Sequence, residues 1–434
     1  MLSVVDPNGN ETKFNEYDRN GNCLNKTSAD GQVVNLEYSG ENLLTKVTTG
    51  SISVEFEYDC AGRVKKYTNE EGYVFTTEYD ANGNVVKLLD AKGNAIQENV
   101  YDEINNLVLT TDTLGVETQL EYDSVGLLKK TISNLNTARQ TESSNTYDNT
   151  GRLTNVKDAE NGTSSYEYDQ VGNITAMIDP NGGRSEYAYD GMGRITESLN
   201  AIGSKKTYEY NAKGLLESAE NSRGQETTYT YCKNGWLESF TDELGTTSYT
   251  YDGNGNVLTV TDENGTITRE YDEMNRVTKY TDFRGNTISY GYDQLGNLVT
   301  LTYPGGRIVR YTYYKTGSLK SVTDWNGGVT NYEYDGNGQL TKTTRPDGSV
   351  ETRTYDVAGK LVSQEDKNGE SVINARDYSY DESGNITNVE MSYGTDFNGL
   401  TSAEMEYDDC NRLIKYNGKA VEYDADGNMI YGPL

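Results

Sequence analysis

The chain contains no histidine among its 434 residues, and this absence excludes imidazole-based acid–base catalysis and histidine metal sites. Cysteine is also scarce. Cys23, Cys60, Cys232 and Cys410 lie far apart in the sequence and form no C-x-x-C pair. This spacing indicates neither a zinc site nor a dense disulfide framework, so we expect no metal and no cofactor.

Long hydrophobic runs are missing too. No apolar stretch is long enough for a signal peptide or a membrane span, so we expect no membrane insertion and no export by a standard signal. Hydrophobic residues make up 34% of the chain, against roughly 45–50% in ordinary domains. Phe is rare and Tyr is common, with 6 and 37 copies. Because a Tyr ring can pack while its hydroxyl stays in water, we expect a thin sheet with two partly wet faces.

One motif accounts for nearly all of the chain. The stretch from Tyr251 to Asp272 contains two Asp-x-x-Gly tetrads, at 252–255 and 262–265, each followed by a short run rich in Thr, Val, Ile, Leu or Tyr. Asp at the first position of a type I turn accepts backbone N–H bonds, and Gly at the fourth adopts the left-handed conformation that closes a hairpin. Each unit is therefore predicted to be a turn, a strand, a second turn and a second strand.

The motif recurs with a period close to 21 residues, and 20 anchor tyrosines mark it. We call the tetrad that follows each anchor tyrosine the anchor turn, and the second tetrad of the unit the midway turn. The anchors are Tyr17, Tyr38, Tyr58, Tyr79, Tyr101, Tyr122, Tyr147, Tyr168, Tyr189, Tyr210, Tyr231, Tyr251, Tyr271, Tyr292, Tyr313, Tyr334, Tyr355, Tyr380, Tyr407 and Tyr423.

Two columns of the repeat support this interpretation. The fourth residue after the anchor is Gly in 16 units and Asn in the others, at Asn42, Asn105, Asn275 and Asn411. These two residue types best tolerate positive φ, so the column indicates a backbone requirement and not a binding signature. The sixth residue is apolar in every unit, as a half-buried strand requires.

The sequence thus predicts an all-β fold of continuous antiparallel hairpins, with residues 1–434 as a single repeat array. Another Tyr often stands two residues before the anchor, as Tyr187 does before Tyr189, and neighbouring units would bring these rings into ladders. A meander of roughly forty strands cannot stay flat, because strands twist and open sheets rarely exceed about ten strands. We expect it to curl, coil or close.

The repeat is regular over residues 1–379, apart from an insertion near 134–144, and it is less regular over 380–434. Both ends fall within a unit. Because unpaired edge strands are prone to aggregate, we expect flanking sequence to cover them.

The net charge of −30 argues against nucleic acid or an anionic membrane as a partner. Much of it has a structural origin. Sixteen acidic residues are the Asp after an anchor Tyr and nine more begin a midway turn, which leaves 43 others against 38 Lys and Arg. We therefore interpret the excess mainly as turn chemistry.

Two functional interpretations of the acidic residues, a calcium site and a catalytic pair, have less support than turn formation. Asp252, Asn254, Asn256 and Glu263 match four positions of an EF-hand calcium loop, but Val257 stands where that loop requires Gly. Paired carboxylates for glycoside hydrolysis should break the repeat, whereas nearly all the prominent acids here belong to it. We expect neither a calcium site nor an enzyme.

Units such as residues 168–174, Tyr-Asp-Gln-Val-Gly-Asn-Ile, resemble the YD repeat of the RHS family, and the resemblance covers essentially the whole chain. That family includes bacterial polymorphic toxins, cocoon-forming subunits of insecticidal toxin complexes, and the teneurins of animal cell surfaces. The resemblance implies hairpins that spiral into a hollow or open curved β-shell around a C-terminal toxin or other passenger, in a secreted or cell-surface protein. The core region that carries cleavage aspartates in many bacterial members has no counterpart here, so no cleavage residue is transferred.

The first hypothesis is therefore a non-enzymatic shell segment whose partners are its own flanking core and passenger. The alternative is a module that binds carbohydrate or a cell surface through exposed Tyr ladders. The residues expected to carry the turns and ladders are, in four representative units, Tyr168, Asp169, Gly172, Tyr189, Asp190, Gly193, Tyr251, Asp252, Gly255, Tyr292, Asp293 and Gly296.

Overall fold

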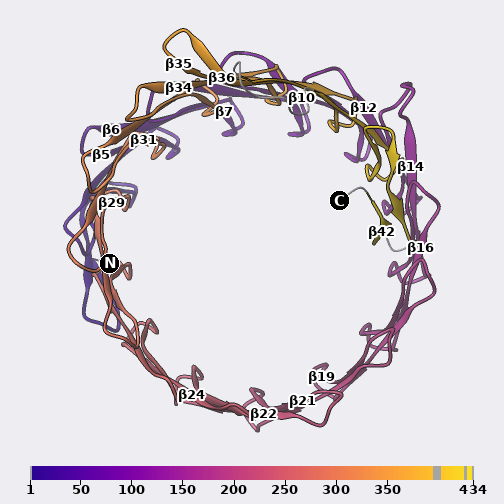
Figure 1. The fold of residues 1–434 in the computed structure, drawn as a ribbon, viewed down its shortest axis with the longest axis horizontal. Coiled ribbons are helices and arrows are strands. Elements are labelled where there is room, and N and C mark those ends of the chain that lie inside the picture. Colours follow the sequence, from indigo (N-terminus) through magenta and orange to yellow (C-terminus); the bar gives the residue numbers. More distant parts are fainter. Residues whose placement is uncertain (1, 394–401, 425–427, 433–434) are drawn as a thin grey trace. The chain divides into compact units, whose positions relative to one another are not determined.

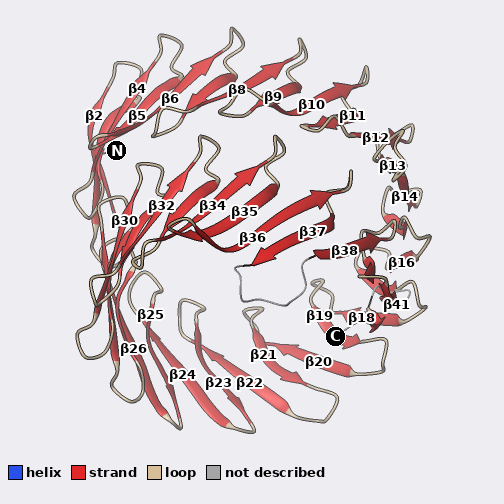
Figure 2. Cartoon of the chain, turned by 45° about the horizontal axis from the view of Figure 1, so that its top comes forward, coloured by secondary structure: helices blue, strands red, loops and turns tan. Residues whose placement is uncertain are grey.

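The computed structural model describes residues 2–393, 402–424 and 428–432, and over these residues it contains 42 β-strands and no helix (Figure 2). Nothing in this part of the chain, accordingly, is a helix of the length and apolarity that crossing a bilayer requires. Contacts divide the chain into two units. Unit 1 comprises Met1–Thr76, Glu209–Gly338 and Thr343–Asp347, and unit 2 comprises Thr77–Tyr208, Gln339–Lys342 and Gly348–Leu434.

The first nine strands run from unit 1 into unit 2. They are β1 (Ser3–Val5), β2 (Glu11–Tyr17), β3 (Cys23–Thr27), β4 (Val33–Tyr38), β5 (Leu44–Thr49), β6 (Ile52–Tyr58), β7 (Val64–Thr68), β8 (Val74–Tyr79) and β9 (Val85–Leu89).

Unit 2 continues through the next eleven strands. They are β10 (Ala95–Tyr101), β11 (Leu107–Asp112), β12 (Glu117–Tyr122), β13 (Leu128–Ser133), β14 (Thr141–Tyr147), β15 (Leu153–Lys157), β16 (Thr163–Tyr168), β17 (Ile174–Ile178), β18 (Arg184–Tyr189), β19 (Ile195–Leu199) and β20 (Lys205–Tyr210).

The chain then returns to unit 1 for twelve strands. They are β21 (Leu216–Glu220), β22 (Glu226–Tyr231), β23 (Leu237–Asp242), β24 (Gly245–Tyr251), β25 (Val257–Asp262), β26 (Gly265–Tyr271), β27 (Val277–Thr281), β28 (Thr287–Tyr292), β29 (Leu298–Thr302), β30 (Ile308–Tyr313), β31 (Leu319–Thr323) and β32 (Val329–Tyr334).

The last ten strands of the described residues include the three longest, which have 8, 10 and 8 residues. They are β33 (Leu340–Thr344), β34 (Ser349–Tyr355), β35 (Leu361–Asn368), β36 (Ser371–Tyr380), β37 (Ile386–Tyr393), β38 (Ser402–Tyr407), β39 (Leu413–Tyr416), β40 (Lys419–Ala420), β41 (Glu422–Tyr423) and β42 (Met429–Tyr431).

Over the described residues, successive strands pair antiparallel in chain order, giving one sheet of 40 strands and a two-stranded sheet of β41 and β42; Figure 1 labels elements along the ribbon. The register repeats from unit to unit. In β18 and β19, Glu186 lies opposite Leu199 and Tyr189 opposite Ile195, with a bulge between Ala188 and Tyr189. The same bulge recurs at other anchor tyrosines, for example at Tyr168 and Tyr292. This confirms the predicted all-β fold of continuous antiparallel hairpins.

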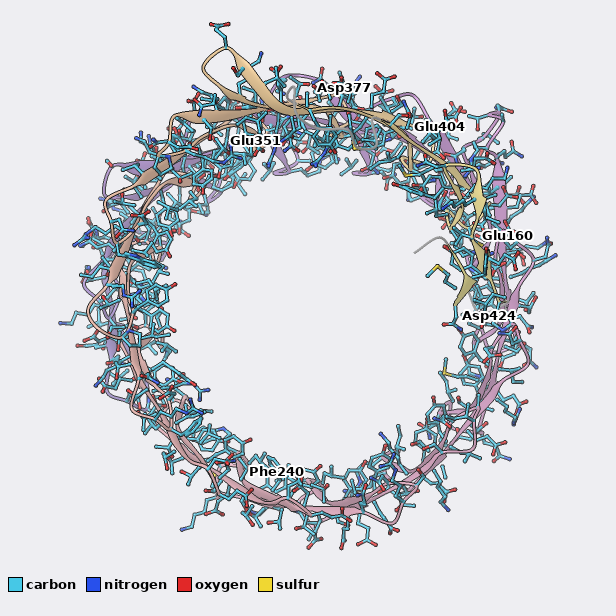
Figure 3. The ribbon with its side chains drawn as sticks, in the orientation of Figure 1. Glu160, Phe240, Glu351, Asp377, Glu404 and Asp424 are labelled. Atoms are coloured by element: carbon cyan, nitrogen blue, oxygen red, sulfur yellow. The ribbon has the colours of Figure 1, made fainter. Side chains whose placement is uncertain are left out.

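The sheet is one layer thick. Among the described residues only Val34, Ile132, Ala176, Val309, Ala403 and Val421 are buried apolar side chains, and no large side chain is fully buried. Side chains project from both faces of the ribbon (Figure 3). The accessible surface is 25440 Å², whereas a compact protein of this mass would expose roughly 16,500 Å². Stability must therefore come from contacts between neighbouring repeats and not from a central core.

Within unit 1, two stretches of the ribbon lie side by side. In Figure 2, β4 and β6 belong to one row of hairpins and β30 and β32 to the next. Hydrogen bonds between residues 244 to 262 positions apart join these rows. The turns at the edge of each row therefore become the places where rows meet.

Candidate functional site

The anchor turns have one geometry, shown here at residues 190–193. Gly193 has φ 78°, and its N–H donates to the carbonyl of Asp190 at 3.0 Å. The Asp190 side chain accepts two further backbone N–H bonds through Oδ1, from Met192 at 2.8 Å and Arg194 at 3.0 Å. The aspartate thus fixes the turn from inside, and the residue with positive φ closes it. The four Asn residues predicted at this column have φ between 60° and 68°, which confirms the backbone requirement.

A second contact holds each anchor turn, and it comes from the residue five positions after the anchor tyrosine. We call this residue the clasp residue. Arg194 Nε donates to Asp190 Oδ2 at 2.7 Å, and Asn173 Nδ2 donates to Asp169 Oδ2 at 2.8 Å. The bond from the Arg194 side chain lowers the pKa of the Asp190 carboxyl, and the bond from Asn173 does the same to the pKa of Asp169, in each case with help from the backbone N–H groups.

The clasp was not predicted from the sequence, although the sequence carries its signal. Sixteen anchor turns begin with Asp, and in 13 of them the clasp residue is Asn or Arg. All 13 form the side-chain bond to the aspartate. Where the turn begins with another residue, the clasp residue is neither Asn nor Arg: these pairs are Ser39 with Leu43, Asn211 with Leu215, Cys232 with Trp236, and Tyr314 with Ser318. Asn or Arg at the clasp position therefore occurs only in turns that begin with Asp.

The hydroxyl of the anchor tyrosine bonds to the preceding repeat. The ladder between β17 and β18 ends at Ala176 and Glu186, which leaves the carbonyl of Ile174 beyond its last rung. The Tyr189 hydroxyl donates to that carbonyl at 2.7 Å. The same bond, at 2.6 to 3.0 Å, is made by Tyr58, Tyr101, Tyr122, Tyr147, Tyr168, Tyr251, Tyr271, Tyr292, Tyr313, Tyr355 and Tyr380.

This bond corrects the expectation that the tyrosine hydroxyls lie in water. A half-buried hydroxyl finds a protein acceptor where one is in reach, and the end of each midway hairpin provides a main-chain carbonyl. Burial also raises the pKa of the Tyr189 hydroxyl, as it does for Tyr251 and Tyr292. The preference for Tyr over Phe follows from this acceptor more than from a wet face.

The clasp residue also touches the next anchor ring. The Arg152 guanidinium lies 4.8 Å from the centroid of the Tyr168 ring, and its Nη1 donates to the carbonyl of Asp169 at 2.9 Å. Arg276 repeats the ring contact with Tyr292, also at 4.8 Å. One arginine therefore ties its own turn to the anchor of the next repeat. Where the clasp residue is Arg152 or Arg276, its guanidinium therefore lies against an anchor ring of the predicted tyrosine ladder.

The twelve residues predicted from four representative units lie in four anchor turns and make the contacts above. Gly172, Gly193, Gly255 and Gly296 have φ of 103°, 78°, 91° and 88°. The hydroxyls of Tyr168, Tyr189, Tyr251 and Tyr292 reach carbonyls at 2.7, 2.7, 2.7 and 2.8 Å. Asp169, Asp190, Asp252 and Asp293 each accept two or more backbone N–H bonds within their turns.

Three of the four residues that match the calcium pattern, Asp252, Asn254 and Asn256, make hydrogen bonds within the protein. Asp252 Oδ2 accepts bonds from Asn256 at 2.8 Å and from Asn8 at 2.9 Å. In the part of the chain that the structure describes, no three Cys, Asp or Glu side chains gather into a group that could hold a metal ion.

The rows of unit 1 meet where midway turns of the earlier row dock against anchor turns of the later row, and we call such a line of contact a seam. Asn254 Nδ2 donates to Asp6 Oδ2 at 2.7 Å, while Asn8 Nδ2 donates to Asp252 Oδ2. Further along the same seam, the N–H of Lys315 donates to Glu71 Oε1 at 2.7 Å. These bonds join turns edge to edge without extending the sheet.

Unit 2 has a seam of its own, and the insertion found in the sequence builds it. Residues 134–140 connect β13 to β14 as an irregular loop. Arg139 in this loop donates from Nη1 to the carbonyl of Tyr407 at 2.7 Å and from Nη2 to that of Asp408 at 3.1 Å, and it lies 3.6 Å from Asp381 Oδ2. A further bond runs from the N–H of Asp409 to Glu160 Oε1 at 2.8 Å. Again a midway element meets anchor turns.

Comparison with known proteins relates this architecture to two protein families. The teneurin YD-shell family matches residues 217–350 and 349–432, and the RHS repeat family matches 17–51, 58–95, 147–184 and 169–205. A relative in Bacillus spizizenii, named tRNA3(Ser)-specific nuclease WapA, is 32% identical over 110 residues, which cover 24% of this chain and 5% of that protein.

Solved structures of toxin proteins share the fold. A crystal structure of TcdB2-TccC3 aligns with a TM-score of 0.60 over 99% of this chain and 32% of that one, at 14% identity. The Tc holotoxin pore of Photorhabdus luminescens aligns with a TM-score of 0.54 over 96% of this chain and 25% of that one, at 16% identity. The chain therefore spans a third or less of these proteins. With its repeated anchor turns, clasps and tyrosine bonds, the chain belongs to the RHS/YD-repeat family.

Proposed function

We propose that this chain is a structural wall segment of a larger RHS-type protein, in which it encloses or presents a C-terminal toxin or other passenger. The observation that carries the proposal is the seam. In unit 1 and in unit 2, side chains of midway turns bond to anchor turns 244 to 269 residues away. These bonds join rows of a one-layer ribbon into a broader surface. A wall needs this arrangement, whereas a binding module of a single ribbon does not.

The composition supports the same role. A sheet with almost no buried core, 34% hydrophobic residues and polar contacts at its seams can stay folded with both faces next to water or to an unfolded chain. In this proposal the protein is not an enzyme, it acts outside the producing cell, and its partners are its own flanking core and passenger.

The carbohydrate-binding alternative loses part of its basis. It relied on exposed Tyr ladders, yet the anchor hydroxyls donate to main-chain carbonyls and so cannot also donate to a sugar. Screening the protein on a glycan array tests this alternative directly, and retention on a defined glycan would revive it.

The shell itself can be tested by electron microscopy of the isolated chain. We expect a thin-walled particle with a solvent-filled interior, and a solid particle would contradict the proposal. Removing the seam contacts of Arg139 with Arg139→Ala should loosen the wall of unit 2. A peptide fused after Leu434 should then be cleaved by added protease faster than in the parent protein, and an equal cleavage rate would argue against containment.

A further inference from the structure

Unit 1 contains a cavity of about 450 Å³ at its seam. The midway turn at residues 69–72 lies on one side of it, and the anchor turns at 314–317 and 335–338 lie on the other. A volume of this size accommodates a small organic molecule. Neither the hairpin repeat nor the proposed wall requires such a space.

Two departures from the repeat meet at this cavity. Tyr314 stands where sixteen other units have Asp, and it is the one tyrosine at that column of the sequence. Tyr73 follows the midway glycine Gly72, a column with no other tyrosine. These residues are 241 positions apart in the sequence, yet both line the cavity. Two separate departures from the repeat thus place aromatic side chains around one cavity, which indicates that the cavity binds a ligand.

The aromatic walls are held in place. The Tyr314 ring lies edge-on to the Tyr334 ring, with centroids 6.0 Å apart and an angle of 89°, and its hydroxyl donates to the carbonyl of Tyr332 at 3.0 Å. The Tyr73 ring packs against Gly336, where an added Cβ would lie 2.8 Å from the ring. Phe75 also lines the cavity and stacks on Tyr67. These contacts fix the rings before any ligand arrives.

The charged side chains in the lining of the cavity are acidic. Its lining includes the carboxylates of Glu71, Glu333 and Asp335, and among the described residues that line it none is Lys or Arg. From outside the lining, the Lys320 ammonium lies 5.5 Å from the centroid of the Tyr314 ring, which is within the distance of a cation–π contact.

We propose that this cavity binds a small organic cation with an alkylated ammonium group. Aromatic ring faces attract such a group through their quadrupoles, and alkylation lowers the cost of taking the charge out of water. The carboxylates supply the opposite charge, and the bulk of the ligand fills a volume too large for a metal ion. An anionic ligand would find no positive partner in the lining, and a neutral one would gain nothing from the carboxylates.

Choline and tetramethylammonium are the probes, and the experiment is isothermal titration calorimetry on the whole chain. We expect one site that binds both cations at micromolar to millimolar concentration, with weaker binding as salt rises. The neutral isostere of choline, 3,3-dimethylbutan-1-ol, should bind roughly tenfold more weakly or not at all. Equal binding of the isostere would overturn the proposal, and so would no binding of either cation.

Two variants locate the site without unfolding the protein. Tyr314→Asn and Tyr73→Asn introduce residues that other units carry at the same columns, at Asn211 and Asn94 respectively. Each should reduce the affinity for choline roughly tenfold, while the melting temperature stays near that of the parent. Tyr303→Asn, which changes a tyrosine of a different turn, is the matched control and should bind choline as the parent does. Unchanged affinity in both cavity variants would place the binding elsewhere and overturn the assignment.

Discussion

The anchor turns and the midway turns of this protein differ in how much they vary. Among the described residues the anchor turns keep one length, with Gly or Asn at the closing position. Midway turns occur as five-residue loops such as 200–204, as tighter turns in which Asp262 pairs directly with Gly265, and as the irregular loop at 134–140.

This difference shows that the length of a turn is constant where the turn contacts several repeats. The backbone geometry of the turn does not explain it. Both turn types place a residue at positive φ, for example Gly193 at 78° and Gly203 at 81°. Only the anchor turn also carries a tyrosine that bonds the preceding repeat, and its clasp residue can contact the next one. Within its row a midway turn closes a single hairpin, so its length can change without disturbing the repeats before and after it.

The largest expected effect is acid destabilisation, because many anchor aspartates act together. Hydrogen bonds hold the pKa of Asp18, Asp80, Asp169 and Asp190 below the ordinary value. Their stabilisation is present above the unfolded-state pKa of about 4 and is lost as pH falls through the lower folded-state values. We therefore expect the melting temperature, followed by circular dichroism, to drop steeply below about pH 4. The triple variant Asp80→Asn, Asp169→Asn, Asp190→Asn should be less stable at pH 7 and should lose less on acidification; an unchanged acid profile would argue against this origin.

The next largest effect is expected from replacing a glycine at positive φ. It should be similar in anchor turns and midway turns. Gly193→Val in an anchor turn and Gly203→Val in a midway turn both force a β-branched residue to positive φ, at a cost of about 1–2 kcal/mol each. Urea denaturation should show similar losses for both. Gly193→Asn is the control and should cost less, since Asn occupies this column in four units. An unaltered midpoint for Gly193→Val would contradict the left-handed turn.

Loss of the tyrosine hydroxyl should destabilise the protein at the anchor position but not at the tyrosine two residues earlier. Tyr189→Phe leaves the Ile174 carbonyl without its donor and should cost about 0.5–1.5 kcal/mol. Tyr187→Phe removes a hydroxyl whose contact is Met177 Sδ at 3.8 Å, so its effect should be close to zero. Thermal unfolding of the two variants measures the difference, and equal stabilities would show that the anchor bond contributes nothing.

The smallest effect concerns the clasp. Asn173→Ala should raise the pKa of Asp169, as read from the pH dependence of its NMR signals, with a modest fall in melting temperature. Asn264→Ala removes a longer bond, 3.3 Å to Asp262 Oδ2 in a midway turn, and should shift that carboxyl less. A larger pKa shift at Asp262 than at Asp169 would contradict the expectation that the side-chain bond is stronger in the anchor turn.

Much of this fold could be predicted from the sequence because its determinants are local. The anchor tyrosines, the Gly or Asn column and the apolar sixth residue gave the hairpins and their order. Contacts between repeats were less accessible. The hydroxyl of Tyr189 was expected in water, because its acceptor is a carbonyl 15 positions away that no residue type at Ile174 announces. The clasp could have been found by comparing columns of the repeat with one another.

The seams could not be predicted, since they depend on how far the ribbon travels before its rows meet. Arg139 belongs to an insertion that appears only as an irregularity in the sequence, yet it bonds two main-chain carbonyls almost 270 positions later. The cavity between Tyr73 and Tyr314 could not be predicted for the same reason, because its lining comes from two rows. Each residue looks like a minor deviation until the structure brings the two together.

The alternation of strand direction limits how this protein can change in length. Each seam sets the midway edge of one row against the anchor edge of another. Deleting a single strand would reverse every strand downstream and exchange the two edges, so that like edges would face each other. Deleting a whole unit of about 21 residues would only shift each turn to the next partner along. Gain or loss of sequence between the rows should therefore be inherited in pairs of strands.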